Sequence, residues 1–167
     1  EGDITTNSGA IQLNGDVVLM NDVTLNTTNA GTGGDIEVTG VIQADDSSVA
    51  DRVLELNAGA GEIRLNDSVG AGATGALAGL VLTAASIRLQ GTEIIVNDPG
   101  ASSSTILFDG DVELQESVTI NVDTTAGPFD NNLTVTGSIN ADDSTAFDRT
   151  LSILAGAGTV TLGGPVG

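Results

Sequence analysis

The residues best suited to chemistry lie in two acidic loops. Each loop carries three aspartates, which are Asp45, Asp46 and Asp51 in the first loop and Asp142, Asp143 and Asp148 in the second. Carboxylate oxygens are the hard ligands that Ca²⁺ prefers, and three of them in one short loop could hold an ion. The sequence requires no cofactor, and Ca²⁺ is the one candidate that these loops suggest.

A second interpretation of the same loops is structural. Arg52 closes the first loop and Arg149 closes the second, so a local Asp–Arg contact could fasten an exposed, solubilising loop. The aspartate spacing is not that of an EF-hand, and the GGxGxDx nonapeptides of calcium-binding β-helices are absent. Four layers of strands stacked at ~4.8 Å would also place the loops ~19 Å apart, too far to share an ion. Both interpretations remain open at this point.

A further set of charged residues lies within apolar segments. If segments 36–38 and 54–56 stack on each other, Glu37 and Glu55 point outward one strand spacing apart, where like charges destabilise. An ion or a neighbouring arginine would relieve that repulsion. Arg64 and Arg88 should stack in the same way. A plain solvated ladder of side chains is the alternative to a binding site here.

Catalysis has little support in the composition. The chain has no His, Cys or Lys, so a Ser nucleophile would lack a His base. A carbohydrate-active β-helix needs paired carboxylates in a groove, and aromatic residues for sugar stacking make up only 2% of the chain. We therefore expect that the chain is not an enzyme.

The charge balance restricts the partners. The formal net charge is −19, and all four basic residues are arginines. Nucleic acid and anionic lipid need clustered basic residues, so we expect neither a nucleic-acid partner nor membrane insertion. No apolar run approaches the ~18 residues of a membrane span. Such a surface attracts cations, and divalent ions or a host or cell-surface ligand are the partners to consider.

The chain repeats itself. Residues 35–70 return as residues 132–167, an offset of 97 residues, and half of the aligned positions are identical. Residues 10–29 return as residues 105–124 with an offset of 95. Such self-similarity indicates a repeat architecture. We therefore expect one continuous unit over residues 1–167, with a first copy at 10–104 and a partial second copy at 105–167.

Short β-branched segments separated by Gly, Asn and Asp predict many short strands and no helix. They fall into four groups of 18 to 27 residues, at 10–34, 35–52, 53–79 and 80–104. Taking each group as one coil predicts an all-β parallel β-helix, or β-solenoid, of about seven coils with four coils per ~97-residue repeat. An antiparallel sandwich is the main alternative, because short strands at regular spacing suit it too.

Alternation within the strands predicts which side chains form the core. The inward set is expected to be Leu54, Leu56, Ile63, Leu65, Leu80, Leu82, Ile87 and Leu89. The intervening Glu55, Arg64 and Arg88 should then point outward, because side chains alternate along a strand. The two runs of small residues, 70–79 and 84–86, are expected to be loops and corners.

Several stretches resemble a known group of proteins. LELNAGAGEIRLNDSVGAG, LVLTAASIRLQGTEIIV and SILAGAGTVTLGGPVG are similar to the repeats of giant bacterial surface proteins, the filamentous-haemagglutinin-like and autotransporter-passenger-like chains. This resemblance implies a secreted parallel β-helix at the bacterial cell surface or in the extracellular matrix, with a structural or adhesive role. It assigns no catalytic or ligand residue.

The expected function is therefore a stiff acidic segment of an extracellular filament. A calcium-dependent binding module is the first alternative, and a carbohydrate-active β-helix is the second. Neither terminal stretch resembles a cap, so we expect continuation into further repeats or end-to-end association with another copy.

Overall fold

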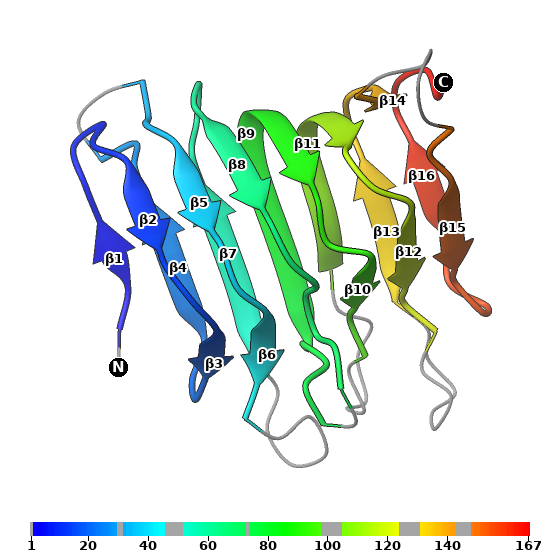
Figure 1. The fold of residues 1–167 in the computed structure, drawn as a ribbon, viewed down its shortest axis with the longest axis horizontal. Helices are drawn as coiled ribbons and strands as arrows, with labels where there is room; N and C mark the ends of the chain where they lie inside the picture. Colours follow the sequence, from blue (N-terminus) through cyan, green and yellow to red (C-terminus); the bar gives the residue numbers. More distant parts are fainter. Residues whose placement is uncertain are drawn as a thin grey trace.

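The computed structural model describes residues 2–29, 32–45, 52–72, 74–97, 105–123, 131–142 and 148–167. These residues form an all-β parallel β-solenoid of about five turns, and no helix occurs among them. The turns stack along the longest axis of the molecule, with the N-terminus at one end and the C-terminus at the other (Figure 1). The predicted fold class is confirmed.

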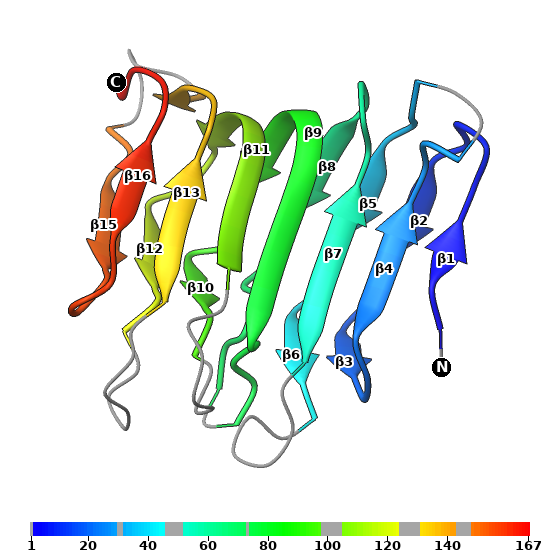
Figure 2. The same ribbon diagram turned by 180° about the vertical axis from the view of Figure 1, so that it is seen from behind.

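Three stacks of strands, here called faces one, two and three, surround the core. Face one consists of β1 (Ile4–Thr5), β4 (Val23–Asn26), β7 (Val53–Asn57), the first halves of β9 (Gly79–Leu89) and β11 (Thr105–Leu114), β13 (Asn132–Val135) and β16 (Val160–Leu162). Face two consists of β2 (Ile11–Leu13), β5 (Ile36–Val38), β8 (Glu62–Leu65), the second halves of β9 and β11, and β14 (Ile139–Ala141). Figure 1 is dominated by face two and Figure 2 by face one.

Face three contains the remaining strands, β3 (Val17–Leu19), β6 (Ile42–Ala44), β10 (Glu93–Ile95), β12 (Val118–Asn121) and β15 (Leu151–Leu154). Val69 connects β6 to β10 through single bridges on both sides. Every pairing between these sixteen strands is parallel. The antiparallel sandwich is therefore wrong for the part of the chain that the structure describes.

The core follows the alternation of the sequence. All eight residues of the predicted inward set are at most 3% exposed. Glu55 is exposed on the outer side of β7, and Arg64 and Arg88 lie partly exposed on the outer side of face two. A slip by one residue would exchange the two sides of each strand, so the predicted register is confirmed.

One corner is built differently from the expectation. Residues 84–86 do form the corner between faces one and two, but β9 continues through it as one strand. In β11 the same corner contains Gly110, whose φ of 152° favours glycine and whose neighbours are shifted in register against β9. A side chain on Gly110 would also strike the carbonyl oxygen of Ala84. Small residues let this corner turn tightly without breaking the strand.

The predicted count of about seven coils is too high. Register partners on successive turns are mostly 24 to 27 residues apart, as in the step from Ile36 to Ile63 and from Ile63 to Ile87. The spacing rises to 33 residues between Ile120 and Ile153. The group at 35–52 supplied only two strands to its coil. The structure completes that turn with β7, which lies beyond the first acidic loop.

The 97-residue repeat is not a whole number of turns. The segment Ile36–Val38 lies on face two, whereas its repeat equivalent, residues 133–135, lies on face one. Eleven strand steps separate them along the chain, counting the two halves of β9 and β11 separately and including Val69. With three strands per turn, the repeat spans three and two-thirds turns, not four. Each copy is therefore rotated by one face relative to the other.

Candidate functional site

The two acidic loops are closed by ion pairs of the same geometry. Arg52 donates from Nε to Oδ1 of Asp45 at 2.8 Å and from Nη2 to Oδ2 at 3.1 Å. Arg149 donates to the two carboxylate oxygens of Asp142 at 3.0 and 3.2 Å, and from Nη1 to Oε2 of Glu116 at 3.2 Å. Two parallel N–H···O bonds fix both orientation and distance. The predicted local Asp–Arg contact is confirmed in both loops.

Most of the remaining members of the proposed calcium set lie outside the part of the chain that the structure describes. Asp46, Asp51 and Asp143 lie outside the described residues, and Asp148 is exposed. Within the ranges that the structure describes, no three His, Cys, Asp or Glu side chains form a group that could hold a metal ion. The loops also lie at different corners, the first between faces three and one and the second between faces two and three. Calcium binding stays a prediction.

The proposed stacking of Glu37 on Glu55 is wrong. Glu37 lies on face two between Gln12 and Arg64, whereas Glu55 lies on face one between Thr24 and Val81. The error has the same origin as the coil count, because the third strand of that turn was assigned to the next coil. Glu37 and Glu55 therefore do not repel each other as register partners, and no ion is needed between them.

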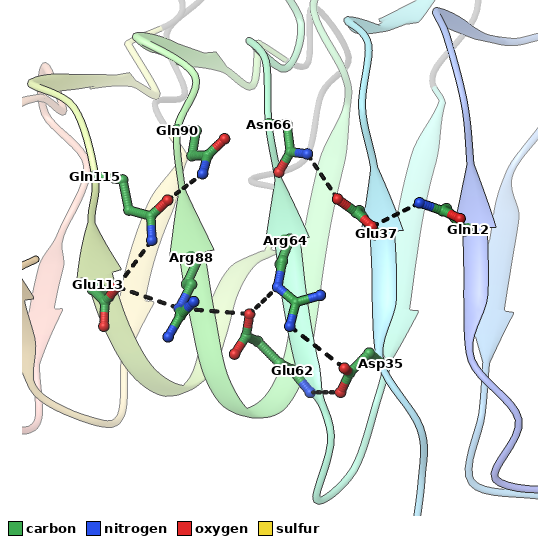
Figure 3. Close-up of polar contacts among 10 residues, drawn as sticks. All are labelled: Gln12, Asp35, Glu37, Glu62, Arg64, Asn66, Arg88, Gln90, Glu113 and Gln115. Carbon is green, nitrogen blue, oxygen red and sulfur yellow. Dashed lines mark hydrogen bonds and ion pairs between the residues drawn. The ribbon is translucent and has the colours of Figure 1, made fainter.

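Arg64 and Arg88 do stack, as predicted, and they form the centre of a charged ladder across face two (Figure 3). Oε1 of Glu62 pairs with Nε of Arg64 and also lies 3.5 Å from Nε of Arg88. Asp35 approaches Arg64 from the preceding turn at 3.5 Å, and Glu113 approaches Arg88 from the following turn at 3.3 Å. Acidic groups thus alternate with the two guanidinium groups along the rod.

Amide side chains extend this ladder on both sides. Gln12 and Asn66 each donate to one carboxylate oxygen of Glu37 at 2.9 Å. Gln115 donates to Glu113 at 3.1 Å and accepts a hydrogen bond from Gln90 of the preceding turn. Most of these bonds connect residues one turn apart, so they act as side-chain rungs beside the main-chain pairing. Exposed pairs of this kind each contribute little, but a connected network contributes more.

Aspartates at strand starts form a third set of contacts that sequence reasoning missed. Asp16, Asp22 and Asp35 each accept a hydrogen bond from a backbone N–H of the next turn, at 2.9 to 3.0 Å. Asp111 does the same with Ser138 at 2.8 Å. The backbone and hydroxyl hydrogen bonds from Ser138 lower the pKa of the Asp111 carboxyl. The signal that could have identified them is an Asp placed directly before an apolar strand segment.

Two hollows among the described residues have largely apolar linings. A cavity of about 20 Å³ inside the first turns has an entirely aliphatic lining that includes Leu13, Leu25 and Leu56. A recess of about 240 Å³ beside β14 is lined by Leu114, Ile139 and Arg149 among others. Arg149 in that recess is already engaged by Asp142 and Glu116. The observed polar contacts thus connect turns to one another and close loops.

Comparison with known proteins found no matching family model, no matching curated protein and no matching solved structure. None of the described residues belongs to a helix long and apolar enough to cross a membrane.

Proposed function

We propose that this chain is a structural or adhesive segment of an extracellular bacterial surface or matrix filament. The observation that carries the proposal is the parallel stacking of the described turns, whose outward polar side chains bond from one turn to the next. Such a stack is a rod, and its stability is a sum of contacts between neighbouring turns. A rod of this kind provides length and stiffness, and this role needs no catalytic centre.

Two kinds of contact support a stiff rod. Main-chain pairing joins every described turn to its neighbours on all three faces, so bending requires many bonds to stretch together. The face-two ladder and the strand-start aspartates add side-chain bonds in the same direction. Carboxylates that are committed to these bonds hold the turns together and are not free to act as an acid–base pair. We therefore propose a role that is not enzymatic.

The location is proposed from the resemblance of the repeats to those of filamentous-haemagglutinin-like and autotransporter-passenger-like chains. A net charge of −19 suits a surface-exposed rod, since like charge keeps neighbouring filaments apart and soluble. The proposed partners are further repeats or further copies joined end to end, together with a cell-surface ligand.

A genetic experiment in the source organism tests the proposal. Leu56→Asp should abolish extended surface material seen by electron microscopy, because it places a charge in the centre of the core. Glu55→Thr alters the adjacent outward position and should leave that material intact. Antibody labelling of intact cells should detect the wild-type chain without permeabilisation. Labelling that requires permeabilisation, or surface material and adhesion that survive Leu56→Asp, would overturn the proposal.

A further inference from the structure

Two reactive dipeptides occupy equivalent places in the two copies of the repeat. Asn14–Gly15 lies between β2 and β3, at the corner between faces two and three. Asp109–Gly110 lies within β11, at the corner between faces one and two. Asn14 and Asp109 are both exposed, and both glycines have positive φ, 105° at Gly15 and 152° at Gly110. No other Asn-Gly or Asp-Gly dipeptide occurs in the sequence.

Asn-Gly is a site of spontaneous chemistry because glycine has no side chain to obstruct its own nitrogen. The backbone nitrogen of Gly15 can attack Cγ of Asn14, which forms an N–Cγ bond, breaks the Cγ–Nδ2 bond and releases ammonia. The proton of the Gly15 N–H is transferred through solvent to the departing Nδ2, which is how that nitrogen leaves as ammonia. Water then opens the five-membered succinimide at either carbonyl and yields aspartate or isoaspartate. At Asp109 the same attack expels water in place of ammonia.

In this structure a threonine holds the attacking nitrogen. Gly15 donates its N–H to Oγ1 of Thr39, one turn away, at 2.9 Å. The backbone N–H of Thr39 is itself fixed by the carbonyl oxygen of Leu13 at 3.0 Å. Attack on Asn14 requires the Gly15 nitrogen to leave Thr39 and to turn toward the side chain, so this bond opposes the reaction.

The second copy has the same arrangement on another corner. Gly110 donates its N–H to Oγ1 of Thr136 at 3.2 Å, and Thr136 donates its hydroxyl hydrogen to Oδ1 of Asp109 at 2.7 Å. Thr136 is the repeat equivalent of Thr39 and is likewise held by a backbone bond, here to Phe108 at 3.0 Å. The threonine therefore accompanies the reactive dipeptide although the two sites face different directions.

Close packing also restricts movement of these corners. The residue after each threonine is a glycine, Gly40 in the first copy and Gly137 in the second. A Cβ on Gly40 would strike the backbone of Gly15 and Asp16, and one on Gly137 would strike the backbone of Gly110. The peptide that follows each reactive glycine is thus covered by the backbone of the next turn, which restricts movement of the glycine itself.

We propose that Asn14 is a site of spontaneous deamidation and that the Thr39 hydroxyl suppresses the reaction in the folded chain. Thr136 protects Asp109 from isomerisation in the same way. Isoaspartate at Asn14 would insert an extra backbone atom between β2 and β3, directly below the stacked second turn. The hydrogen bonds from Gly15 to Thr39 and from Gly110 to Thr136 therefore protect strand register over the lifetime of the rod.

The test follows both sites by peptide mapping and mass spectrometry, with isoaspartate detected by enzymatic methylation. Folded wild-type chain is incubated at mildly alkaline pH beside chain unfolded in urea. We expect Asn14 to deamidate more slowly in the folded chain. Thr39→Val should accelerate the reaction about fivefold, the factor that corresponds to one lost hydrogen bond, and Thr39→Ser should restore the wild-type rate.

The site at which the reaction accelerates distinguishes loss of one threonine hydrogen bond from a general loss of stability. Thr39→Val should accelerate reaction at Asn14 and leave Asp109 unchanged, whereas Thr136→Val should do the reverse. Thr119→Val, which makes the same chemical change on face three and away from both dipeptides, should alter neither rate. Acceleration of both sites together in either variant would overturn the proposal. So would a folded Thr39→Val chain that deamidates at the wild-type rate.

Discussion

The shared carboxylate of Glu62 is the point at which the face-two ladder is most sensitive to substitution. Arg64 and Arg88 are direct register partners, so their Cα atoms are separated by about one strand spacing of ~4.8 Å. Glu62 lies between their guanidinium groups and is the more buried partner, with 18% of its side chain exposed. Glu62→Gln keeps the shape of the side chain and removes the charge that separates the two cations.

The expected loss follows from the geometry of the two arginines. Two unit charges at about this distance repel by ~1 kcal/mol in bulk water and by ~4 kcal/mol near a protein surface. The arginine side chains are 33% and 37% exposed, and each keeps one further carboxylate, so the lower part of that range applies. We expect Glu62→Gln to lower the free energy of unfolding by about 1–2 kcal/mol at low salt.

Glu55→Gln is the matched control. Glu55 lies exposed on face one between Thr24 and Val81, away from either arginine. Removing its charge from a chain of net charge −19 relieves repulsion and should leave stability unchanged or slightly raised. The same chemical change should thus destabilise the fold at Glu62 and not at Glu55.

Urea unfolding at two salt concentrations provides the measurement. The effect of Glu62→Gln should shrink as salt increases, because the screening length falls from ~10 Å at 0.1 M to ~3 Å at 1 M. Glu62→Gln combined with Arg88→Gln should recover most of the loss, since no pair of facing cations then remains. Equal effects of Glu62→Gln and Glu55→Gln, or a loss that is independent of salt, would refute this account of the ladder.

Burial, acid and calcium each provide a further test. Leu56→Asp should cost more than about 4 kcal/mol because it buries an unpaired charge, whereas Glu55→Thr should stay within about 0.5 kcal/mol; equal shifts in melting temperature would contradict the register. Because the pKa of Asp111 is lowered by its bonds to Ser138, the carboxylate stabilises the fold above its unfolded pKa, and that contribution is lost as pH falls through the lower folded pKa. An NMR titration should show this pKa rising partway toward 3.8 in Ser138→Ala, and an unchanged value would be inconsistent with the hydroxyl bond. If Ca²⁺ raises the melting temperature through the first acidic loop, Asp45→Asn should abolish the rise, and an unaltered response would place the site elsewhere.

Local patterns in the sequence were sufficient to predict the strands and their inward sides. Alternation at positions such as Leu54, Glu55 and Leu56 has a period of two residues and needs no knowledge of the neighbouring turn. The Asp45–Arg52 contact was also accessible, because both residues belong to one short loop. These predictions depend only on residues that are close in sequence.

Closure of the turns could not be predicted in the same way. Whether β7 completes the second turn or begins the third depends on which strand it pairs with. Its partner is β4, on the preceding turn, and β5 and β6 separate the two strands along the chain. The acidic loop before β7 was taken as the end of a coil, although β6 and β7 on either side of it belong to the same turn. The contacts of Glu62 and Asp35 were missed for the same reason. They join residues on different turns, so they can be identified only when the register between turns is known.

The rotation between repeat copies explains which residues the copies share. Because each copy presents its strands on different faces, the shared residues serve the turn geometry that every face needs, such as Thr39 and Gly40 in one copy and Thr136 and Gly137 in the other. The outward residues have different neighbours and differ accordingly. In repeat order, Glu37, Glu55, Glu62 and Arg64 of the first copy correspond to Thr134, Ser152, Thr159 and Thr161 of the second. A charged ladder needs arginines and carboxylates on neighbouring turns of one face, and face two supplies them around Arg64 and Arg88. The second copy can therefore keep the corners of the first while Thr134 and Thr161 take the place of charged residues on the outer side of face one.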